Sequence, residues 1–232
     1  MKLAIMQPYL FPYLGYFQLA AAVDKFVFYD DVNYIKNGWI NRNRLSLAGE
    51  VRYITIPLAG ASSFLKINQI LVQKHSLWQR KIIESVRHSY SKAPKFTDVS
   101  NLFSEVLLAD ECCISEIAKR SVVAVSRYLG LKTQFVMSSS RYGNAHYVGS
   151  DRVLDICQQE NATNYYNLPG GKNLYNDEMF HANGITLRFI KPNLGLYRQF
   201  SGEFIPGLSI IDVLMFNDRD IARELLTTEL GS

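Results

Sequence analysis

Cysteine and histidine are scarce in this chain of 232 residues, and their scarcity excludes two kinds of site. The cysteines show no C-x-x-C spacing, since Cys112 and Cys113 are adjacent and Cys157 stands alone. We therefore expect neither a disulfide framework nor a structural zinc site, and predict reduced, mostly buried thiols. The histidines lack the H-x-x-x-H and H-E-x-x-H spacings of zinc proteins; they are His75, His88, His146 and His181. We expect no metal ion, and no cofactor is indicated.

Long apolar runs are also missing. Hydrophobic residues make up 48% of the chain, yet no segment reaches the roughly 18 uncharged apolar residues of a membrane span. The apolar start ends at Gln7-Pro8, which is too early for the hydrophobic region of a signal peptide. We therefore expect a cytoplasmic protein that does not contact membranes. The final Gly231-Ser232 is either native or an expression scar.

The chain has little excess of either charge. It holds 25 basic and 21 acidic residues, for a net charge of +4. A duplex-binding protein gathers Lys and Arg on one face, whereas these residues are dispersed here, apart from Lys36, Arg42 and Arg44. Duplex nucleic acid is therefore not an expected partner, and this small group suits a phosphate or carboxylate better.

No repeat, low-complexity tract or linker divides the chain, so we expect a single α/β domain over residues 1–232. Residues at about 75–130 are a candidate for a helical subdomain within it. Strands alternate with helices, which predicts a mainly parallel sheet with flanking helices. A small antiparallel portion is expected near residues 45–72, with 51–58 pairing with 67–72. The other predicted elements are strands 3–6, 25–29, 134–137, 164–168 and 185–190, and helices 15–23, 76–90, 110–129 (ending at Gly130) and 150–159 (capped by Ser150).

The first three elements predict a parallel βαβ unit. Strand 3–6, helix 15–23 and strand 25–29 fit within about 30 residues, the spacing of such a unit. Ligands of open α/β sheets bind at the carboxyl ends of the strands. Gln7-Pro8-Tyr9 and Asp30-Asp31 follow two of these ends, so we place the candidate site there.

Aromatic residues are concentrated at the same end of the chain. Residues 1–44 hold 10 of the 29 aromatic side chains, interleaved with the run Asn41-Arg42-Asn43-Arg44. Amide and guanidinium groups side by side supply many hydrogen-bond donors for an anionic guest. The alternative is structural: the arginines lie on one face of an exposed strand, and the rings fill the core.

Two adjacent carboxylates after a strand suggest acid–base chemistry. In an extended segment Asp30 and Asp31 point to opposite faces, so at most one looks into a given site, as a general base. The alternative is an ion pair with Lys36 or an arginine, and Lys36 itself either stabilises a developing negative charge or neutralises an aspartate. A magnesium site would need further oxygen ligands that the sequence does not nominate. His88 lies at a predicted helix end, where a cation complements the helix dipole; general acid or base is its alternative role.

A set of motifs runs along nearly the whole chain: Gln7-Pro8-Tyr9, Phe11-Pro12, Gly15-Tyr16-Phe17, Asp24, Tyr29-Asp30-Asp31-Val32, Tyr34, Lys36, Trp39, Asn41-Arg42-Asn43, Tyr90, Ala93-Pro94, Phe96, Tyr197, Gln199 and Leu208-Ser209-Ile210-Ile211-Asp212. The motifs from Gln7 to Asn43 resemble the opening signature of the WbqC-like proteins, and the later ones resemble the family's middle and closing motifs. Members of this family come mainly from bacterial surface-polysaccharide and O-antigen gene clusters. The resemblance implies a role in building or decorating an unusual sugar.

The first βαβ unit is also distantly similar to the nucleotide-binding opening of the class I synthetase and nucleotidylyltransferase superfamily. That resemblance implies a Rossmann-like (HUP-like) sheet. The superfamily holds ATP phosphates with H-x-G-H, and Tyr13-Leu14-Gly15-Tyr16 stands at the matching place. The glycine is kept, but both histidines are tyrosines, which carry no positive charge at neutral pH. Met137-Ser138-Ser139-Ser140-Arg141 is similar to the superfamily's second loop.

Together, the residues and the resemblance lead to one functional hypothesis. We expect an enzyme that transfers an acyl or aminoacyl group to the amine of a nucleotide-linked amino sugar, with acyl-CoA, an aminoacyl-tRNA or an ATP-activated acid as donor. Asp30, Asp31 and Lys36 would be catalytic. The substrate-binding candidates are Gln7, Tyr9, Tyr16, Trp39, Asn41, Arg42, Asn43, Arg44, His88, Tyr197, Gln199 and Asp212. The alternative is a non-catalytic protein that binds a sugar nucleotide or a partner enzyme of the same pathway, since rings and arginines also form interface hot spots.

Overall fold

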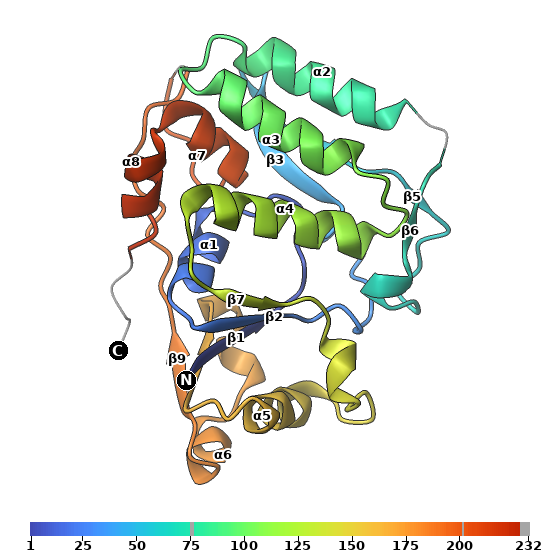
Figure 1. Ribbon diagram of the computed structural model, residues 1–232, viewed down its shortest axis with the longest axis vertical. Helices are drawn as coiled ribbons and strands as arrows, with labels where there is room; N and C mark the ends of the chain where they lie inside the picture. The colour runs from blue at the N-terminus through green and yellow to red at the C-terminus, as the bar shows by residue number, and fades with distance from the viewer. Residues whose placement is uncertain (75–76, 201, 228–232) are drawn as a thin grey trace.

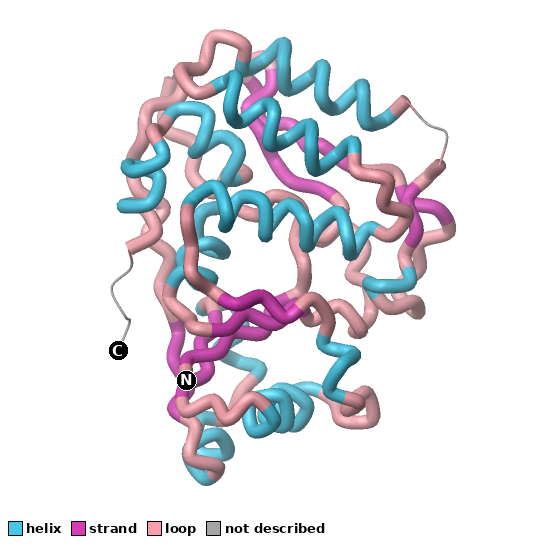
Figure 2. Tube along the Cα trace, in the orientation of Figure 1, coloured by secondary structure: helices cyan, strands magenta, loops and turns pink. Residues whose placement is uncertain are grey.

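The computed structural model describes residues 1–74, 77–200 and 202–227. Its centre is a five-stranded sheet of order β7-β2-β1-β8-β9 in which every pair is parallel (Figures 1 and 2). The strands are β1 (Lys2–Met6), β2 (Lys25–Phe28), β7 (Gln134–Val136), β8 (Asn164–Asn167) and β9 (Thr186–Phe189). This is the 3-2-1-4-5 order of a Rossmann-like sheet. His75 and the start of the predicted helix at Ser76 lie outside the described residues, as does Gly231-Ser232.

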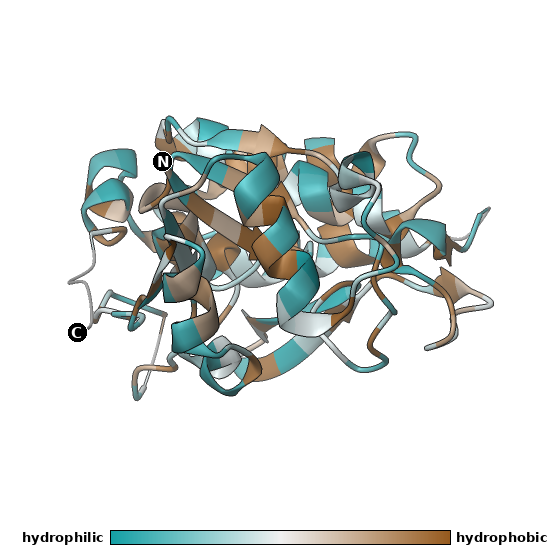
Figure 3. Cartoon of the chain, turned by 90° about the horizontal axis from the view of Figure 1, so that it is seen from below, coloured by the Kyte–Doolittle hydropathy of each residue, from teal (hydrophilic) through white to brown (hydrophobic). Residues whose placement is uncertain are grey.

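Helices cover both faces of the sheet (Figure 1). On one face lie α1 (Leu14–Ala21) and α4 (Ile114–Leu129), with α2 (Trp78–Tyr90) and α3 (Phe96–Leu108) stacked beyond α4, and α7 (Ile210–Phe216) and α8 (Arg219–Glu224) beside them. On the other face lie α5 (Gly149–Gln159) and α6 (Asp177–Ala182), seen from below in Figure 3. The predicted α/β class, with a mainly parallel sheet and flanking helices, is confirmed.

Alternation along the strands explains why both faces are covered. Ala4 and Phe26 point to the α1 and α4 side, whereas Leu3, Ile5 and Val27 point to the α5 side, and all five side chains are buried. A parallel strand buried on both faces reads as a nearly continuous apolar run. That is the pattern that made β1 and β2 recognisable in the sequence.

The antiparallel portion consists of two small hairpins. Strand β3 (Arg42–Leu47) pairs with β4 (Glu50–Thr55), and β5 (Leu58–Ala59) pairs with β6 (Leu71–Val72). The predicted pairing of strand 51–58 with 67–72 was therefore wrong for most of the strand, because only residues 58–59 pair with residues of that segment. The cause is a two-residue turn at Ala48-Gly49, where both φ angles are positive (52° and 82°), as tight hairpins require.

Element boundaries show three further differences from the sequence prediction. Helix α4 ends at Gly130 in the left-handed conformation (φ 72°), as predicted, but it begins at Ile114 because Cys113 forms a bridge to Leu71. Helix α5 begins at Gly149, so Ser150 is not its N-cap. Helix α3 was not predicted. Three 3-10 turns complete the fold: η1 (Ile67–Gln69), η2 (Ser139–Tyr142) and η3 (Pro169–Leu174). In the described part of the chain no helix has both the length and the apolar character of a bilayer crossing.

Candidate functional site

A cleft of about 690 Å³ opens at the carboxyl ends of β1 and β8. The chain leaves β1 toward β2 and β7 on one side and later returns to β8 on the other, so the cleft lies where the strand order reverses. This switch point is where open α/β sheets bind their ligands. The volume is within the roughly 300 to 1,000 Å³ range of small-molecule sites. It is therefore the first candidate for a binding site.

Segments that are far apart in the sequence form the cleft. They are the end of β1 with the loop after it, the residue after β2, the loop before β3 with β3 itself, the end of β8 with η3, and the loop after β9. The lining residues are Ile5, Met6, Gln7, Tyr9, Pro12, Tyr13, Tyr29, Ile35, Trp39, Asn43, Arg44, Asn167, Leu168, Pro169, Gly170, Gly171, Leu174, Tyr175, Leu194 and Gly207. Most of the side chains are aromatic or aliphatic. The lining described here includes one cation, Arg44, and no carboxylate, histidine, lysine or cysteine.

Arg44 is the charged group of the cleft. Its guanidinium carbon lies 5.7 Å from the ring centre of Trp39, and one terminal nitrogen donates to the carbonyl of Gly207 at 3.1 Å. Its Nε is buried and has no hydrogen-bond partner among the described residues. An unsatisfied buried donor costs about 1–3 kcal/mol, so Arg44 retains hydrogen-bonding capacity that an anionic ligand can use.

The neighbouring Arg42 has a different role. Its Nε donates to the carbonyl of Gly38 at 3.2 Å, a terminal nitrogen donates to the carbonyl of Asn37, and its guanidinium carbon lies 4.5 Å from the ring centre of Tyr53. Arg42 does not line the cleft. It holds the loop that places Trp39 at the cleft wall, and the loop bends at Asn37, where φ is 61°.

Two of the amide side chains among the substrate-binding candidates, Asn41 and Asn43, are buried structural groups. Asn43 donates to the carbonyls of Leu10 (2.9 Å) and Phe11 (2.8 Å), so it supports the loop above the cleft. Asn41 donates to the carbonyl of Ile56 and accepts from the phenol of Tyr34, both at 2.9 Å. These contacts occupy the amide groups within the protein, and only Asn43 also lines the cleft.

The tyrosines near β1 divide between the core and the cleft. Tyr16 is fully buried and donates to the carbonyl of Gln7 at 2.8 Å, which makes it a support and not a ligand group. Tyr9 and Tyr13 line the cleft, and among the described residues neither phenol has a hydrogen-bond partner. Burial raises the pKa of Tyr9, and burial followed by the nearby Tyr9 raises the pKa of Tyr13. Both hydroxyls therefore stay protonated and can donate.

Gly15 sits where no side chain fits. A Cβ there would lie 2.6 Å from a ring carbon of Tyr13 and 2.8 Å from the Cβ of Pro192. Helix α1 thus begins in close contact with a loop from the C-terminal half. This explains the glycine of the Tyr13-Leu14-Gly15-Tyr16 segment by packing.

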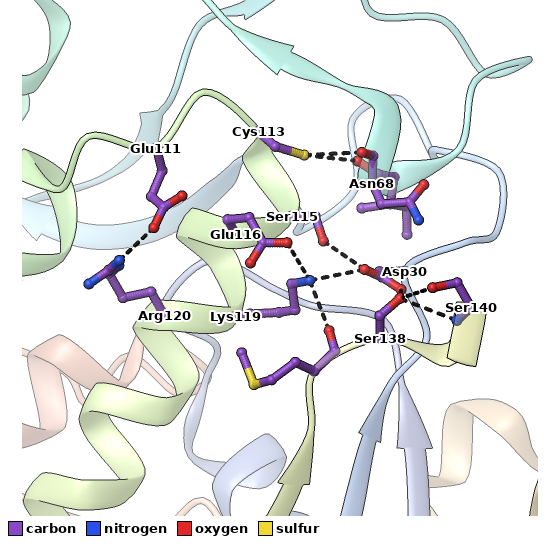
Figure 4. Close-up of polar contacts among 12 residues, drawn as sticks. Asp30, Asn68, Glu111, Cys113, Ser115, Glu116, Lys119, Arg120, Ser138 and Ser140 are labelled. Atoms are coloured by element: carbon purple, nitrogen blue, oxygen red, sulfur yellow. Dashed lines mark hydrogen bonds and ion pairs between the residues drawn. The ribbon is translucent and has the colours of Figure 1, made fainter. Parts of the chain in front are cut away.

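Asp30 is tied into a buried network away from the cleft (Figure 4). Its side chain accepts from Lys119 at 3.0 Å, from Ser115 at 3.2 Å and from Ser138 at 2.7 Å. Lys119 also donates to the carbonyl of Met137 at 2.8 Å and pairs with Glu116 at 2.6 Å. Burial alone would lower the pKa of Lys119, but the hydrogen bonds to Glu116 and Asp30 raise it. The ammonium stays charged, and the network joins β2 to α4 and β7.

Asp31 points the other way, as expected for the second of two adjacent residues in an extended segment. It accepts hydrogen bonds from Arg152 and Ser139 on the α5 side of the sheet. Arg152 donates its Nε to Asn144 at 2.9 Å and lies 5.0 Å from the ring centre of Tyr29. Neither aspartate lines the cleft, and Lys36 is exposed outside it. The predicted catalytic trio is therefore not brought together.

A second buried carboxylate, Asp212, holds the C-terminal segment in place. It accepts from Tyr90 at 2.5 Å, Tyr197 at 2.6 Å and Gln199 at 3.1 Å. Burial raises the pKa of Asp212, and these hydrogen bonds only partly offset that effect. The four residues form a connected group, but none of them lines the cleft. His88 is exposed in the last turn of α2, also outside the cleft.

The turn after β8 was undervalued in the sequence. Asn167 donates to the phenols of Tyr165 at 3.0 Å and Tyr175 at 3.1 Å and accepts from the backbone of Leu168 at 2.7 Å. A Cβ on Gly171 would come within 2.9 Å of the Asn167 amide nitrogen. The Pro-Gly-Gly sequence therefore forms a fixed cleft wall, and its position after a predicted central strand was the signal that could have found it.

Within residues 1–74, 77–200 and 202–227 no cluster of three or more His, Cys, Asp or Glu side chains could hold a metal ion. Cys112, Cys113 and Cys157 are free thiols, of which Cys112 is exposed, and burial raises the pKa of Cys157 to about 12.

A Rossmann-like α/β protein with an aromatic cleft at the switch point is the class that the fold and site define. The chain belongs to the WbqC-like protein family, whose model matches residues 7–224. It is 31% identical over 219 residues to the uncharacterized protein Rv1507c of Mycobacterium tuberculosis strain H37Rv, and the match covers 93% of each chain. No solved structure matches the chain significantly.

Proposed function

We propose that the cleft binds a nucleotide-linked amino sugar and that the protein transfers an acyl or aminoacyl group to its amine. The observation that carries the proposal is the position of Arg44 in an aromatic cleft at the switch point, with an unpartnered buried Nε. A planar guanidinium grips diphosphate oxygens, and rings cover bases and sugars. The pathway would be the biosynthesis of an unusual sugar for a surface polysaccharide such as O-antigen, in the cytoplasm.

The cleft residues receive specific roles in this proposal. Arg44 meets the diphosphate, and Trp39 and Tyr9 cover the base or the sugar. Gln7, whose side chain has no hydrogen-bond partner among the described residues, reads a hydroxyl or an amide. Tyr13 and Tyr9, both protonated, donate to the acyl oxygen as negative charge develops there. Such donors contribute a few kcal/mol, roughly 3–4, to lowering a barrier.

Asp30 and Asp31 have no direct part in this scheme, because both carboxylates are bound to cations elsewhere. The amine reacts in its neutral form, and rate enhancement comes from holding it against the activated carbonyl. Mass spectrometry tests the transfer step: the purified protein is incubated with nucleoside-diphosphate amino sugars and each donor class in turn. A product heavier by the acyl or aminoacyl group supports transfer. Saturable sugar-nucleotide binding with no product from any donor contradicts it.

A second candidate function is binding without chemistry. It is favoured by one observation: the described cleft lining has no carboxylate, histidine, lysine or cysteine to act as a base or nucleophile. In that case the protein would present a sugar nucleotide to a partner enzyme. The same incubation separates the two functions, since only the first produces a covalently changed sugar.

A further inference from the structure

The outer face of the β3–β4 hairpin carries polar and aromatic side chains, and its β4 residues are exposed to solvent. Cross-strand partners share a face, and the register pairs Arg42 with Thr55, Arg44 with Tyr53 and Ser46 with Val51. Tyr53 is 49% exposed and Val51 is 41% exposed. We call these six residues the hairpin face. The other side of the hairpin packs into the core through residues such as Leu45 and Ile54.

The hairpin face continues the wall of the cleft. The ring centres of Trp39 and Tyr53 are 6.2 Å apart, with the ring planes inclined by 31°. Arg44 lies against Trp39 (5.7 Å) and Arg42 against Tyr53 (4.5 Å). Trp39 and Arg44 also line the cleft. Two rings and two guanidinium groups thus form a path from the cleft onto the open surface.

The charges on this path have one sign. Glu50, the nearest acidic residue in the hairpin, pairs in register with Leu47 and so belongs to the opposite side. There it is bound to Arg52 at 2.8 Å. The hairpin face therefore has two cations and, among its described residues, no carboxylate. This pattern complements a polyanion that has exposed aromatic bases.

We propose that the hairpin face binds the unpaired end of an RNA, which carries the donor group to the cleft. The inference rests on the proposed function and selects its donor class. Proteins recognise unpaired RNA by stacking bases on exposed rings of a sheet surface and by placing arginines against the backbone. Trp39 covers the sugar nucleotide in the cleft, so Tyr53 is the exposed ring that stacks on a base of the RNA.

The chemistry of this donor suits the cleft. An acyl or aminoacyl group on the terminal ribose is an ester. The sugar amine attacks its carbonyl carbon, the new C–N amide bond forms, and the C–O bond to the ribose breaks. The proton lost by the amine ends on the released ribose hydroxyl, so the step is balanced without a further reactant. It also needs no net proton acceptor from the protein, which agrees with the described cleft lining.

Fluorescence anisotropy with a labelled single-stranded RNA of five nucleotides tests the proposal. The native protein binds the probe saturably and more weakly as salt is raised. Tyr53→Thr, which keeps a residue of high β-propensity in the strand, weakens binding by about tenfold because a stacking ring is lost. Tyr53→Phe keeps the ring and binds like the native protein. Arg52→Gln removes a cation from the opposite side of the hairpin and serves as the matched control, with affinity unchanged.

Three results would overturn the RNA assignment. They are failure of the native protein to bind the probe, native affinity in Tyr53→Thr, and competition by coenzyme A or by a duplex at the same concentrations as the single strand. A separate titration keeps the two proposals apart. Because Tyr53 does not line the cleft, Tyr53→Thr binds nucleotide-linked amino sugars as the native protein does. If the native protein does not bind nucleotide-linked amino sugars, the proposed function is contradicted, and the RNA-binding result still stands.

Discussion

Arg42 and Arg44 have different roles although they lie two residues apart on the same face of β3. In the sequence they are equivalent cations flanking Asn43. In the structure Arg42 is held by two backbone carbonyls of the loop before it, whereas Arg44 reaches the cleft. The sequence pattern predicted an anion-binding segment, and Arg44 is the cation of that segment that lines the cleft. It could not separate the two roles, because they depend on the path of the 37–39 loop.

The buried carboxylate of Asp212 predicts an unusual pH dependence of stability. Burial raises its pKa in the folded protein above the unfolded value, so the folded state binds the proton more tightly. The stabilisation that Asp212 contributes is therefore fully present below the ordinary aspartate pKa. It is lost as the pH rises through the raised pKa that Asp212 has in the folded protein. Asp212→Asn keeps an acceptor oxygen and removes the titration. Its stability relative to the native protein therefore increases with pH across this window, measured by urea denaturation at a series of pH values.

The control for this prediction is Asp212→Ala. It leaves the hydroxyls of Tyr90 and Tyr197 without their acceptor, and its free energy of unfolding lies below that of Asp212→Asn by about 1–3 kcal/mol at every pH in the window. The prediction is contradicted if the free energy of unfolding changes with pH in the same way for the native protein and Asp212→Asn. In that case the pKa of Asp212 is the same in the folded and the unfolded protein.

At the scale of elements, the first βαβ unit could be predicted and its partners could not. Apolar runs and the break at Gln7-Pro8 predicted β1 and its end. The opposite orientation of Asp30 and Asp31 followed from strand geometry. Their partners, Lys119 on α4 and Arg152 on α5, lie 89 and 121 residues further along the chain. No local pattern predicts which helix docks on which face, so the ion pairs were assigned to the nearer Lys36 or an arginine.

The pair of Asp30 and Lys119 is expected to hold α4 on the sheet. Lys119→Met removes the cation and leaves a carboxylate that is 1% exposed with only serine donors. Losing one partner of a buried pair lowers the free energy of unfolding by about 3–5 kcal/mol. Urea denaturation measures the change. The matched control is Glu116→Gln: its side chain is 44% exposed, and its loss changes stability by less than about 1 kcal/mol.

A second variant checks that the loss in Lys119→Met comes from the uncompensated charge. Lys119→Met combined with Asp30→Asn removes both charges and recovers part of the stability, because no isolated buried ion remains. If the double variant is no more stable than Lys119→Met, the loss in Lys119→Met does not come from an uncompensated charge on Asp30.

At the scale of the molecule, the sheet order places the cleft. Residues 5–44 supply much of its lining, residues 167–175 supply the wall across the switch point, and Leu194 and Gly207 complete the lining. The sequence placed the candidate site near Gln7 and Tyr9, at the carboxyl end of the first strand, and both residues line the cleft. It did not predict the opposite wall of the cleft. That wall depends on β8 pairing with β1, and more than 100 residues separate these two strands in the sequence. Fold class was predictable from alternation, and site composition was not.

A ligand that joins these walls stabilises the whole fold. At a concentration of about 100 times its dissociation constant, a ligand specific for the folded state adds about 2.7 kcal/mol. For a chain of this size that raises the melting temperature by roughly 5–10 °C. Thermal denaturation monitored by circular dichroism, with and without a nucleotide-linked amino sugar, measures the shift. The corresponding free amino sugar, which lacks the diphosphate, serves as the control and gives a smaller shift.

The most direct test of the central claim is calorimetric titration of the protein with a nucleotide-linked amino sugar. The account predicts one site per chain and an affinity that falls more than tenfold in Arg44→Gln, because charge-assisted hydrogen bonds to the diphosphate, worth about 1.5–3 kcal/mol, are lost. Arg52→Gln, on the other side of the same hairpin, binds like the native protein. Absence of binding, or equal affinity in Arg44→Gln and the native protein, would contradict the assignment of the cleft.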